Sequence, residues 1–285
     1  MEEFDASCPG TLYLVATPIG NLGDVSARAA QTLGSVDFIA AEDTRVTLKL
    51  LGHLGIKKAL LSYHEHNRRE SGDKILERLL SGESGALVTD AGVPCISDPG
   101  VDLVRVCCEA GIPVTSVPGP CAAVTALSLS ALPAGRFTFE GFLSTARKSR
   151  FEHLNSLKTE SRTMVFYEAP HKLVRTLNDM LEVFGDRRVS ISRELTKFYE
   201  ETLRCSLSEA VQHFEQKPPR GEFVIVIEGA AEKPAAQIDI KDAVAAADLY
   251  IEGGLSLKDS VKKVSEETGI QKNTLYSAMI KRDGQ

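Results

Sequence analysis

The amino-acid sequence predicts two α/β domains, the first with a mostly parallel sheet and the second with a mixed sheet, followed by a small helical appendage. Three observations support this fold class. From residue 11, short apolar or β-branched runs alternate with segments of helical periodicity, which is the pattern of βαβ units. The alternation becomes less regular after a basic stretch near residue 144, and it is purely helical near the end. We therefore expect domains at residues 10–143, 144–229 and 238–285.

The first domain is predicted to alternate five strands with five helices. The strands are expected at residues 11–17, 38–41, 59–62, 86–89 and 114–117. The helices are expected at residues 25–33, 46–52, 69–80, 101–110 and 122–130. Asp24 is a candidate N-cap for the first helix, and Pro120 precedes the last one. Parallel strands joined by helices predict a sheet with its ligand-binding loops along one edge.

The second domain is predicted to follow a linker at residues 144–150. Its strands are expected at residues 163–167, 189–193, 200–205 and 223–227. Its helices are expected at residues 151–157, 172–184 and 208–214. Because the second and third of these strands lie only a few residues apart, they predict a hairpin, and the sheet should therefore be mixed.

The C-terminal segment follows an alanine-rich stretch at residues 230–237, which is typical of a flexible connector. Ser256 is expected to cap a helix that ends at Glu267, and Gly269 is expected to form a turn before a helix at residues 272–280. This spacing is compatible with a helix-turn-helix, although any pair of antiparallel helices would show much of it.

The composition excludes several classes of protein. Of the 285 residues, 43% are hydrophobic and 25% are charged, which excludes a largely disordered chain. No apolar run approaches the roughly 20 residues that span a bilayer, and the acidic N-terminus does not fit a signal peptide. The six cysteines include no Cys-x-x-Cys pair, so we expect reduced, mostly buried thiols. The sequence thus predicts a cytoplasmic protein without a membrane segment or a metal site.

Net charge limits the nature of any nucleic-acid contact. The formal charge is −6, so a polyanion would have to meet a local basic patch rather than the whole surface. The pair His64 and His66 resembles a metal cluster at first sight. However, adjacent loop histidines without further ligands at suitable spacing are a weak metal signal, and we expect no metal there.

Four loops follow the carboxyl ends of predicted strands, where open α/β sheets bind ligands. They comprise residues 17–24, 89–100, 117–123 and 167–171. The first lacks the spacing of a nucleotide-binding glycine motif, so an ordinary turn and a ligand loop remain alternatives. The second holds two aspartates, two prolines and two glycines in twelve residues, which is longer than a simple connection needs and favours function. Close packing alone could explain the third.

Two charged clusters add candidate chemistry at strand ends. Residues 41–45 and 192–197 each place carboxylates beside cations. This combination suits a general base and a phosphate-binding group, and a solvated ion pair is the alternative for each cluster.

In combination, these segments resemble the class III methyltransferases, the tetrapyrrole-methylase-like family that uses S-adenosylmethionine, and within it the members that modify small-subunit ribosomal RNA. The resemblance spans about residues 10–229 and is carried by residues 14–24, 41–45, 88–94, 117–120 and 167–171. Tetrapyrrole-modifying members usually have Gly-Asp-Pro in the second loop, where this chain has Asp90-Ala91-Gly92. This difference argues against a tetrapyrrole substrate.

The resemblance implies a homodimer that binds S-adenosylmethionine in the cleft between its two α/β domains. It further implies methylation of the ribose 2′-hydroxyl of a P-site cytidine in 16S ribosomal RNA of the small ribosomal subunit. The cofactor-binding residues that it implies are Pro18, Ile19, Gly20, Asp90, Ala91, Gly92, Val93, Cys121, Ala122, Ala123 and Tyr167.

Methyl transfer to a hydroxyl needs a group that removes the proton of the acceptor. The candidates for this role are Asp43, Glu42, Glu194 and His171. The cations expected to contact the RNA backbone are Arg45, Arg193, Lys197, Lys258, Lys262, Lys263 and Lys272. Two alternatives remain, a methyltransferase of a tetrapyrrole or corrinoid and a ligand-sensing DNA-binding regulator. The second is disfavoured by the single lysine in residues 272–280.

Overall fold

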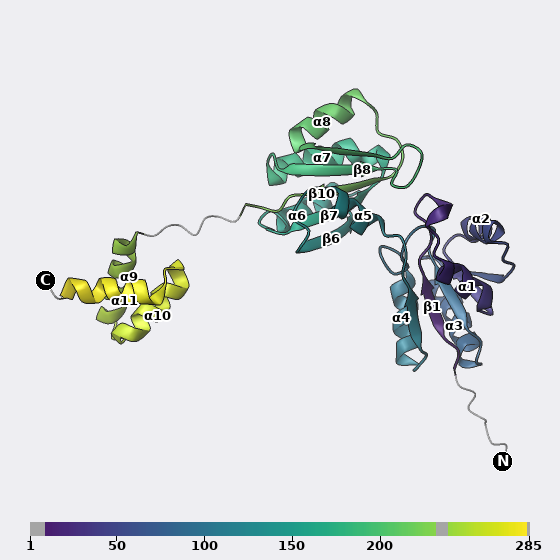
Figure 1. The fold of residues 1–285 in the computed structure, drawn as a ribbon, viewed down its shortest axis with the longest axis horizontal. Coiled ribbons are helices and arrows are strands. Elements are labelled where there is room, and N and C mark those ends of the chain that lie inside the picture. Colours follow the sequence, from purple (N-terminus) through teal and green to yellow (C-terminus); the bar gives the residue numbers. More distant parts are fainter. Residues whose placement is uncertain (1–8, 232–238, 284–285) are drawn as a thin grey trace, which may run out of the picture. The chain divides into compact units, whose positions relative to one another are not determined.

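The computed structural model describes residues 9–231 and 239–283, with the side chains of the last three of these left out (Figure 1). The chain forms two compact units, residues 1–229 and residues 230–285. The connector expected at residues 230–237, the domain boundary at residue 238 and Cys8 lie largely or wholly outside the described residues.

The first sheet has five parallel strands in the order β3-β2-β4-β1-β5. These strands are β1 (Leu12–Val15), β2 (Phe38–Ala41), β3 (Ala59–Ser62), β4 (Gly85–Val88) and β5 (Val114–Val117). Its helices are α1 (Ala27–Ser35), α2 (Thr44–Leu54), α3 (Arg68–Leu80) and α4 (Gly100–Glu109). Apolar residues of α1 and α2 pack on one face, and those of α3 and α4 pack on the other. The predicted parallel sheet is confirmed.

The start of the first helix differs from the prediction. Asp24 ends a short 3-10 helix, η1 (Leu22–Asp24), rather than capping α1. Ser26 caps α1 instead, because its hydroxyl accepts a hydrogen bond from the amide of Ala29 at 3.0 Å.

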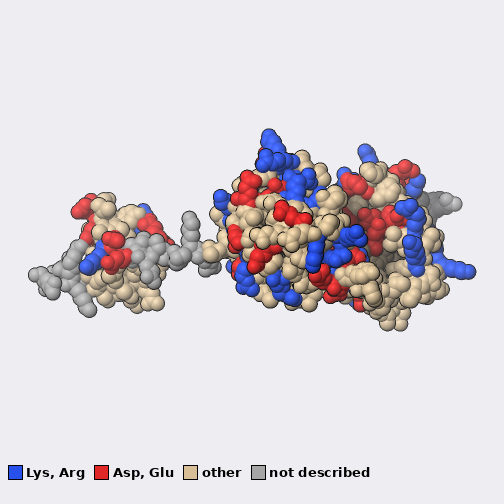
Figure 2. Space-filling view, turned by 90° about the horizontal axis from the view of Figure 1, so that it is seen from above, with Lys and Arg blue, Asp and Glu red and all other residues tan. Residues whose placement is uncertain are grey.

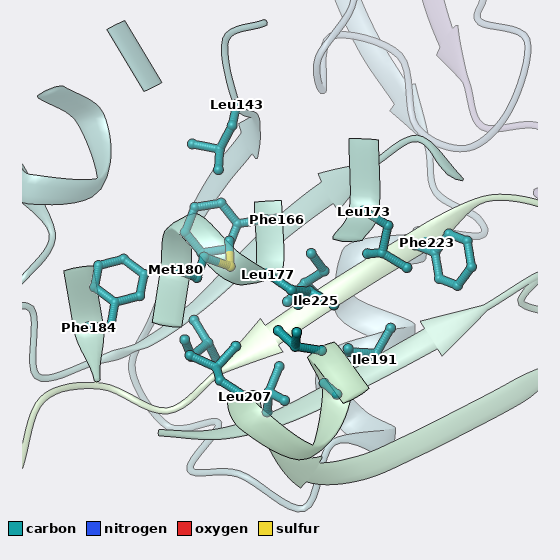
Figure 3. Close-up of a cluster of buried hydrophobic side chains, with 14 of the residues drawn as sticks. Leu143, Phe166, Leu173, Leu177, Met180, Phe184, Ile191, Leu207, Phe223 and Ile225 are labelled. Atoms are coloured by element: carbon teal, nitrogen blue, oxygen red, sulfur yellow. The ribbon is translucent and has the colours of Figure 1, made fainter. Parts of the chain in front are cut away.

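The second sheet is mixed, with the order β6-β7-β10-β8-β9. Its strands are β6 (Phe137–Phe142), β7 (Thr163–Glu168), β8 (Arg188–Arg193), β9 (Glu201–Ser206) and β10 (Phe223–Ile227). Only β6 and β7 pair in parallel, while β8 and β9 form the expected antiparallel hairpin. The helices α6 (Arg147–Ser156), α7 (Pro170–Phe184) and α8 (Leu207–Gln216) cover one face. Figure 3 shows Leu177 and Met180 of α7 packed over Phe166 and Ile225.

Two elements within residues 10–143, the range expected for the first domain, belong with the second sheet. The sequence analysis placed no strand at β6, whose ladder is interrupted between Phe139 and Gly141 and whose exposure does not alternate. The helix α5 (Ala122–Leu129) packs through Ala123, Ala126 and Leu127 against the other face of the second sheet. The domain limits 10–143, 144–229 and 238–285 stay predictions.

The second unit consists of three helices that pack on one another, α9 (Ile240–Glu252), α10 (Leu257–Thr268) and α11 (Lys272–Asp283). Their small core includes Ala247, Val264 and Leu275. The predicted cap is confirmed, because the Ser256 hydroxyl accepts the Asp259 amide, and Gly269 ends α10 in the left-handed conformation. None of the helices in the described part of the chain is long and apolar enough to cross a membrane.

The prediction of mostly buried thiols is wrong for the described cysteines. Only Cys107 is buried, whereas Cys108 is exposed and the remaining three are half-buried. All five are free thiols. For Cys108 the reason is its place next to Cys107, since neighbouring residues on a helix cannot both face the core.

The predicted linker at residues 144–150 is also wrong at its C-terminal end, where α6 begins. Arg150 is almost completely buried in this helix, and its Nε lies 2.6 Å from Oδ2 of Asp179 on α7. Its guanidinium also donates to the carbonyl oxygens of Ser144 and Thr145, both at 3.0 Å. Arg150 therefore stabilises the packing of α6 on α7 and is not part of a solvated connector.

Replacing this arginine should destabilise the protein strongly. Arg150→Ala leaves the buried carboxylate of Asp179 without its partner, which should lower the free energy of unfolding by about 3–5 kcal/mol. Lys148→Ala, at an exposed position of the same helix, should change it by less than about 0.5 kcal/mol. Urea denaturation measures both. Equal stabilities of the two variants would contradict this account of the segment.

Candidate functional site

The main cavity of unit 1 lies where loops after the strands of both sheets meet. Its volume is about 560 Å³, within the usual range for small-molecule sites. The first sheet contributes the segments that follow β1, β2 and β4, and the second contributes the ends of β6 and β7 and the start of β10. Figure 2 shows acidic side chains gathered in the hollow of this unit. The cavity therefore belongs to both sheets.

A pair of backbone hydrogen bonds joins the first loop to the second. The amide of Thr17 donates to the carbonyl of Gly92 at 2.9 Å, and the amide of Gly92 donates back at 3.1 Å. Gly92 has a φ of +88°, and a Cβ there would lie 3.4 Å from the Ile19 side chain and 3.5 Å from the Pro120 carbonyl oxygen. Only glycine adopts this backbone without strain. The first, second and third loops thus converge around Gly92.

Contacts between the sheets close the other side of the cavity. A Cβ on Gly20 would lie 2.5 Å from Cγ of Lys197 and 2.8 Å from Oγ1 of Thr196, so the loop after β1 packs directly on the loop after β8. The hydroxyl of Tyr167 accepts the amide of Ala123 at 3.2 Å. Burial raises the pKa of Tyr167 to about 12, so this phenol stays protonated at neutral pH.

Backbone strain is concentrated in the two loops beside the cavity. Four of the five described non-glycine residues with positive φ are Cys95, Ser97, Glu194 and Thr196, at +72°, +65°, +51° and +64°. Each such residue costs free energy and persists only where its surroundings hold it. This concentration marks both loops as functional candidates.

Of the five carboxylates that line the cavity among the described residues, Glu42, Asp90 and Glu168 have different partners. Oε2 of Glu42 accepts the Thr89 hydroxyl at 2.7 Å. Asp90 accepts the amide of Asp43 at 2.9 Å, and burial raises the pKa of Asp90. Glu168 is buried, and its oxygens accept the Thr176 hydroxyl at 2.6 Å and Nζ of Lys172 at 3.0 Å. Both hydrogen bonds to Glu42, from the Thr89 hydroxyl and the Asp90 amide, go to Oε2, so its Oε1 has no hydrogen-bond partner among the described residues.

The other expected proton acceptors are placed differently. Asp43 is the N-cap of α2, and both of its oxygens accept hydrogen bonds from the Arg45 side chain. These hydrogen bonds lower the pKa of Asp43 to about 2. Burial tends to raise the pKa of Glu194, but hydrogen bonds from Lys197 and the Glu222 amide outweigh it and hold that pKa below its usual range. His171 is exposed on α7. These three side chains are outside the described cavity lining.

The cavity brings together eight of the eleven expected cofactor residues. They are Ile19, Asp90, Ala91, Gly92, Val93, Cys121, Ala122 and Tyr167. Pro18, Gly20 and Ala123 are adjacent to lining residues but are not among the described ones that form the wall. For all eleven residues, contact with the cofactor stays a prediction.

Several lining residues were missed by the sequence analysis. Ser97 and Asp98 lie in the long second loop, and Glu168 lies in the fourth loop. Both loops were predicted as ligand loops, although these three residues were not among the candidates. Phe142 and Glu222 carried none, because each reaches the wall only through the pairing of the second sheet.

The cations expected to contact RNA have carboxylate partners in unit 1. Arg45 is bound to Asp43, Arg193 lies 3.7 Å from Glu201, and Lys197 lies 2.9 Å from both Glu194 and Glu222. In unit 2, Lys258, Lys262, Lys263 and Lys272 are exposed, and the ammonium of Lys263 lies 4.2 Å from the centre of the Tyr250 ring.

Comparison with known proteins defines the class to which this fold and site belong. The family model of the tetrapyrrole (corrin/porphyrin) methylases matches residues 11–211. Among solved structures, a uroporphyrin-III C-methyltransferase from Thermus thermophilus aligns with a TM-score of 0.55 at 20% identity, covering 76% of this chain and 94% of that one. A cobalt precorrin-4 methyltransferase aligns with a TM-score of 0.59 at 16% identity, with the same coverage of both chains. The chain belongs to the tetrapyrrole methylase family.

Within this family, the curated relatives share one name. The proteins called ribosomal RNA small subunit methyltransferase I from Halalkalibacterium halodurans and Escherichia coli O157:H7 are 47% and 42% identical to this chain. The matches cover 94% and 96% of this chain and the same shares of those proteins. The protein of that name from Thermotoga maritima is 50% identical and is matched over 99% of its length, which covers 77% of this chain.

The ion pair at the start of α2 should control the titration of Asp43. Arg45→Ala removes the side-chain hydrogen bonds but keeps the backbone amide, so the pKa of Asp43 should rise from about 2 toward its ordinary value of about 3.9. In wild type the group should therefore stay ionised at every pH above about 3, and in the variant it should take up a proton at higher pH. Carbon-detected NMR titration measures this directly.

The control for this titration is a second pair of the same kind. The pKa of Glu160 is lowered to about 2, chiefly by hydrogen bonds from Arg162. Arg162→Ala should raise the pKa of Glu160 and leave that of Asp43 where it was. An unchanged Asp43 titration in Arg45→Ala would show that another group stabilises this carboxylate.

Proposed function

We propose that this chain is an S-adenosylmethionine-dependent methyltransferase that 2′-O-methylates the ribose of a P-site cytidine in 16S ribosomal RNA of the small ribosomal subunit. The observation that carries the proposal is the likeness to ribosomal RNA methyltransferases over nearly the whole chain, at 42–47% identity for the relatives from H. halodurans and E. coli. The solved tetrapyrrole enzymes share the fold at 16–20% identity, so the ribosomal relatives favour an RNA acceptor over a corrinoid.

The cavity fits S-adenosylmethionine in size and chemistry. Backbone can approach a ligand closely at Gly92, where no side chain intervenes. The apolar part of the cavity wall includes Ile19, Ala122 and Val224. Asp90 provides a carboxylate that can accept hydrogen bonds from an ammonium group or from ribose hydroxyls. We propose that the loops at residues 18–20, 90–93 and 121–123, together with Tyr167, hold the cofactor. Bound S-adenosylmethionine supplies an activated methyl group.

The protein must hold the ribose oxygen close to the methyl carbon and accept its proton. We assign the proton-accepting role to Glu42. Its carboxylate lines the cavity, and the Thr89 hydroxyl fixes Oε2, while Oε1 has no hydrogen-bond partner within the described residues. The candidates Asp43 and Glu194 each accept a hydrogen bond from a cation, Arg45 and Lys197 respectively, and neither lines the cavity.

Asp43 is better suited to positioning than to proton transfer. Its carboxylate caps α2 and holds the exposed guanidinium of Arg45 through hydrogen bonds of 2.6 and 3.0 Å. Its amide in turn donates to the cavity residue Asp90. We propose that Arg45, placed in this way, contacts a phosphate next to the target nucleotide.

Isosteric amides separate these two roles. Glu42→Gln should lower the single-turnover rate of methyl transfer by roughly 10²- to 10⁴-fold, the range for loss of a general base, while leaving cofactor affinity close to wild type. Asp43→Asn should have a smaller effect on this rate and should act mainly on RNA affinity. Rapid-quench kinetics with saturating cofactor and RNA measure the chemical step. A full rate in Glu42→Gln would move the assignment to Asp43, Glu194 or His171.

We also propose that the lysines of α10 and α11 help to hold the RNA backbone. Lys258, Lys262 and Lys272 are exposed and belong to the second compact unit. Neutralising Lys258 and Lys262 as glutamines should make the salt dependence of RNA binding shallower. An unchanged slope of affinity against salt would show that these lysines do not contact the RNA backbone. That the protein is a homodimer in the cytoplasm stays a prediction. Light scattering of the purified protein would test the oligomeric state.

The methyl acceptor itself provides the test of the proposed function. Small ribosomal subunits that lack the modification should take up labelled methyl from S-adenosylmethionine, and digestion to nucleosides should place the label on the ribose of cytidine. Label on a base, or transfer to a corrinoid but not to subunits, would contradict the proposal.

A further inference from the structure

Two exposed aromatic rings lie on the loop that contributes Leu195 to the cavity wall. Phe198 and Tyr199, in the loop after β8, are 93% and 67% exposed, the highest values among the described aromatic hydrophobic residues. Phe142, at 54%, lines the cavity directly. Leu195 of the same β8 loop lines the cavity too, and Lys197 of this loop bonds to the lining residue Glu222. Rings of this size are normally buried, so their exposure on a loop that also reaches the cavity needs a reason.

The loop that carries Phe198 and Tyr199 is held rigidly. The amide of Thr196 donates to Oε2 of Glu200 at 2.7 Å, and the amide of Glu200 donates to the carbonyl of Lys197 at 3.1 Å. The carboxylate of Glu194 accepts both Nζ of Lys197 and the amide of Glu222, each at 2.9 Å. The strained backbones of Glu194 and Thr196 are thus fixed by hydrogen bonds. The two rings pack edge to face with centroids 5.0 Å apart, so presenting them costs little further ordering.

We propose that Phe198 and Tyr199 form a stacking platform for an unpaired RNA base next to the target nucleotide. The inference rests on the proposed function and adds the surface that receives the substrate. A ribose can enter the cavity only if its nucleotide leaves the stack of its neighbours, which exposes the adjoining base. Proteins bind such bases on aromatic side chains, largely regardless of sequence.

Charge and area favour a base over a second copy of this chain. The cations of the loop are already paired, Lys197 with Glu194 and Glu222, and Arg193 with Glu201, so the platform offers stacking rather than net charge. Two aromatic side chains bury at most about 500 Å², whereas a stable protein interface needs about 800 Å² from each partner. Charged residues flank the pair on both sides, at Lys197 and Glu200. The patch is therefore of a size for one or two bases.

The test measures the affinity for unmethylated small ribosomal subunits over a range of salt concentrations. The double variant Phe198→Ala with Tyr199→Ala should bind about 5- to 150-fold more weakly, the loss of one stacked base. The slope of affinity against salt should stay at the wild-type value, because no charge is removed. The double variant Phe198→Trp with Tyr199→Trp should bind like wild type, since both rings remain aromatic. Leu80→Ala removes an exposed apolar side chain at the end of α3 and should have no effect.

The outcomes separate the platform from the proposed function. Cofactor affinity and thermal stability should be unchanged in the alanine variant, because both rings are exposed. If wild type methylates the subunits and the alanine variant binds them equally well, the platform is overturned alone. Conversion of a dimer to a monomer in the alanine variant, seen by light scattering, would assign the rings to self-association and overturn it as well. A wild-type chain that neither binds nor methylates subunits would overturn the proposed function together with the platform.

Discussion

The pair of hydrogen bonds between Thr17 and Gly92 is the constraint on which the site depends. It joins the loops after β1 and β4, which come from neighbouring strands of the first sheet. Because Gly92 has a φ of +88°, its backbone can turn back toward Ile19, and Ile19 in turn packs with α5 and the second sheet. The bridge thus fixes the position of the loop after β4 against the loop after β1, which carries Ile19 into the contact with the second sheet. The long loop at residues 89–100 can then carry strain at Cys95 and Ser97.

The same arrangement explains why the carboxylates differ in chemical role. Glu42 and Asp43 are adjacent in sequence, and successive residues at the end of a strand point to opposite sides. Glu42 lines the cavity, and Asp43 caps a helix and binds Arg45. One position therefore leaves a carboxylate open to a ligand, and the next fixes a guanidinium at the surface. Both residues are carboxylates, so their different roles follow from backbone geometry rather than from the type of side chain.

The sequence predicted the sheets well and the site less completely. The strands at residues 38–41, 59–62, 114–117 and 223–227 agree with the structure at both ends, because each is a continuous apolar or β-branched run bounded by turns. The edge strand β6 was missed, since its ladder shifts register at Glu140 and its burial is irregular. Loop residues such as Asp90 and Tyr167 could be chosen from their place after strands. Phe142 and Glu222 could not, because they reach the cavity through long-range strand pairing, which local patterns do not encode.

Calorimetric titration of S-adenosylmethionine tests the central claim, that the loops converging on Gly92 form the cofactor site. With a chelator present, wild type should bind the cofactor at one site per chain. Gly92→Ala should bind it roughly tenfold more weakly, since a side chain at this positive φ costs about 1–2 kcal/mol and the free loop would relax away from the conformation that binds the cofactor. Gly135→Ala, where a Cβ meets nothing within 4 Å, should bind like wild type. Absence of heat in wild type, or full affinity in Gly92→Ala, would contradict the account.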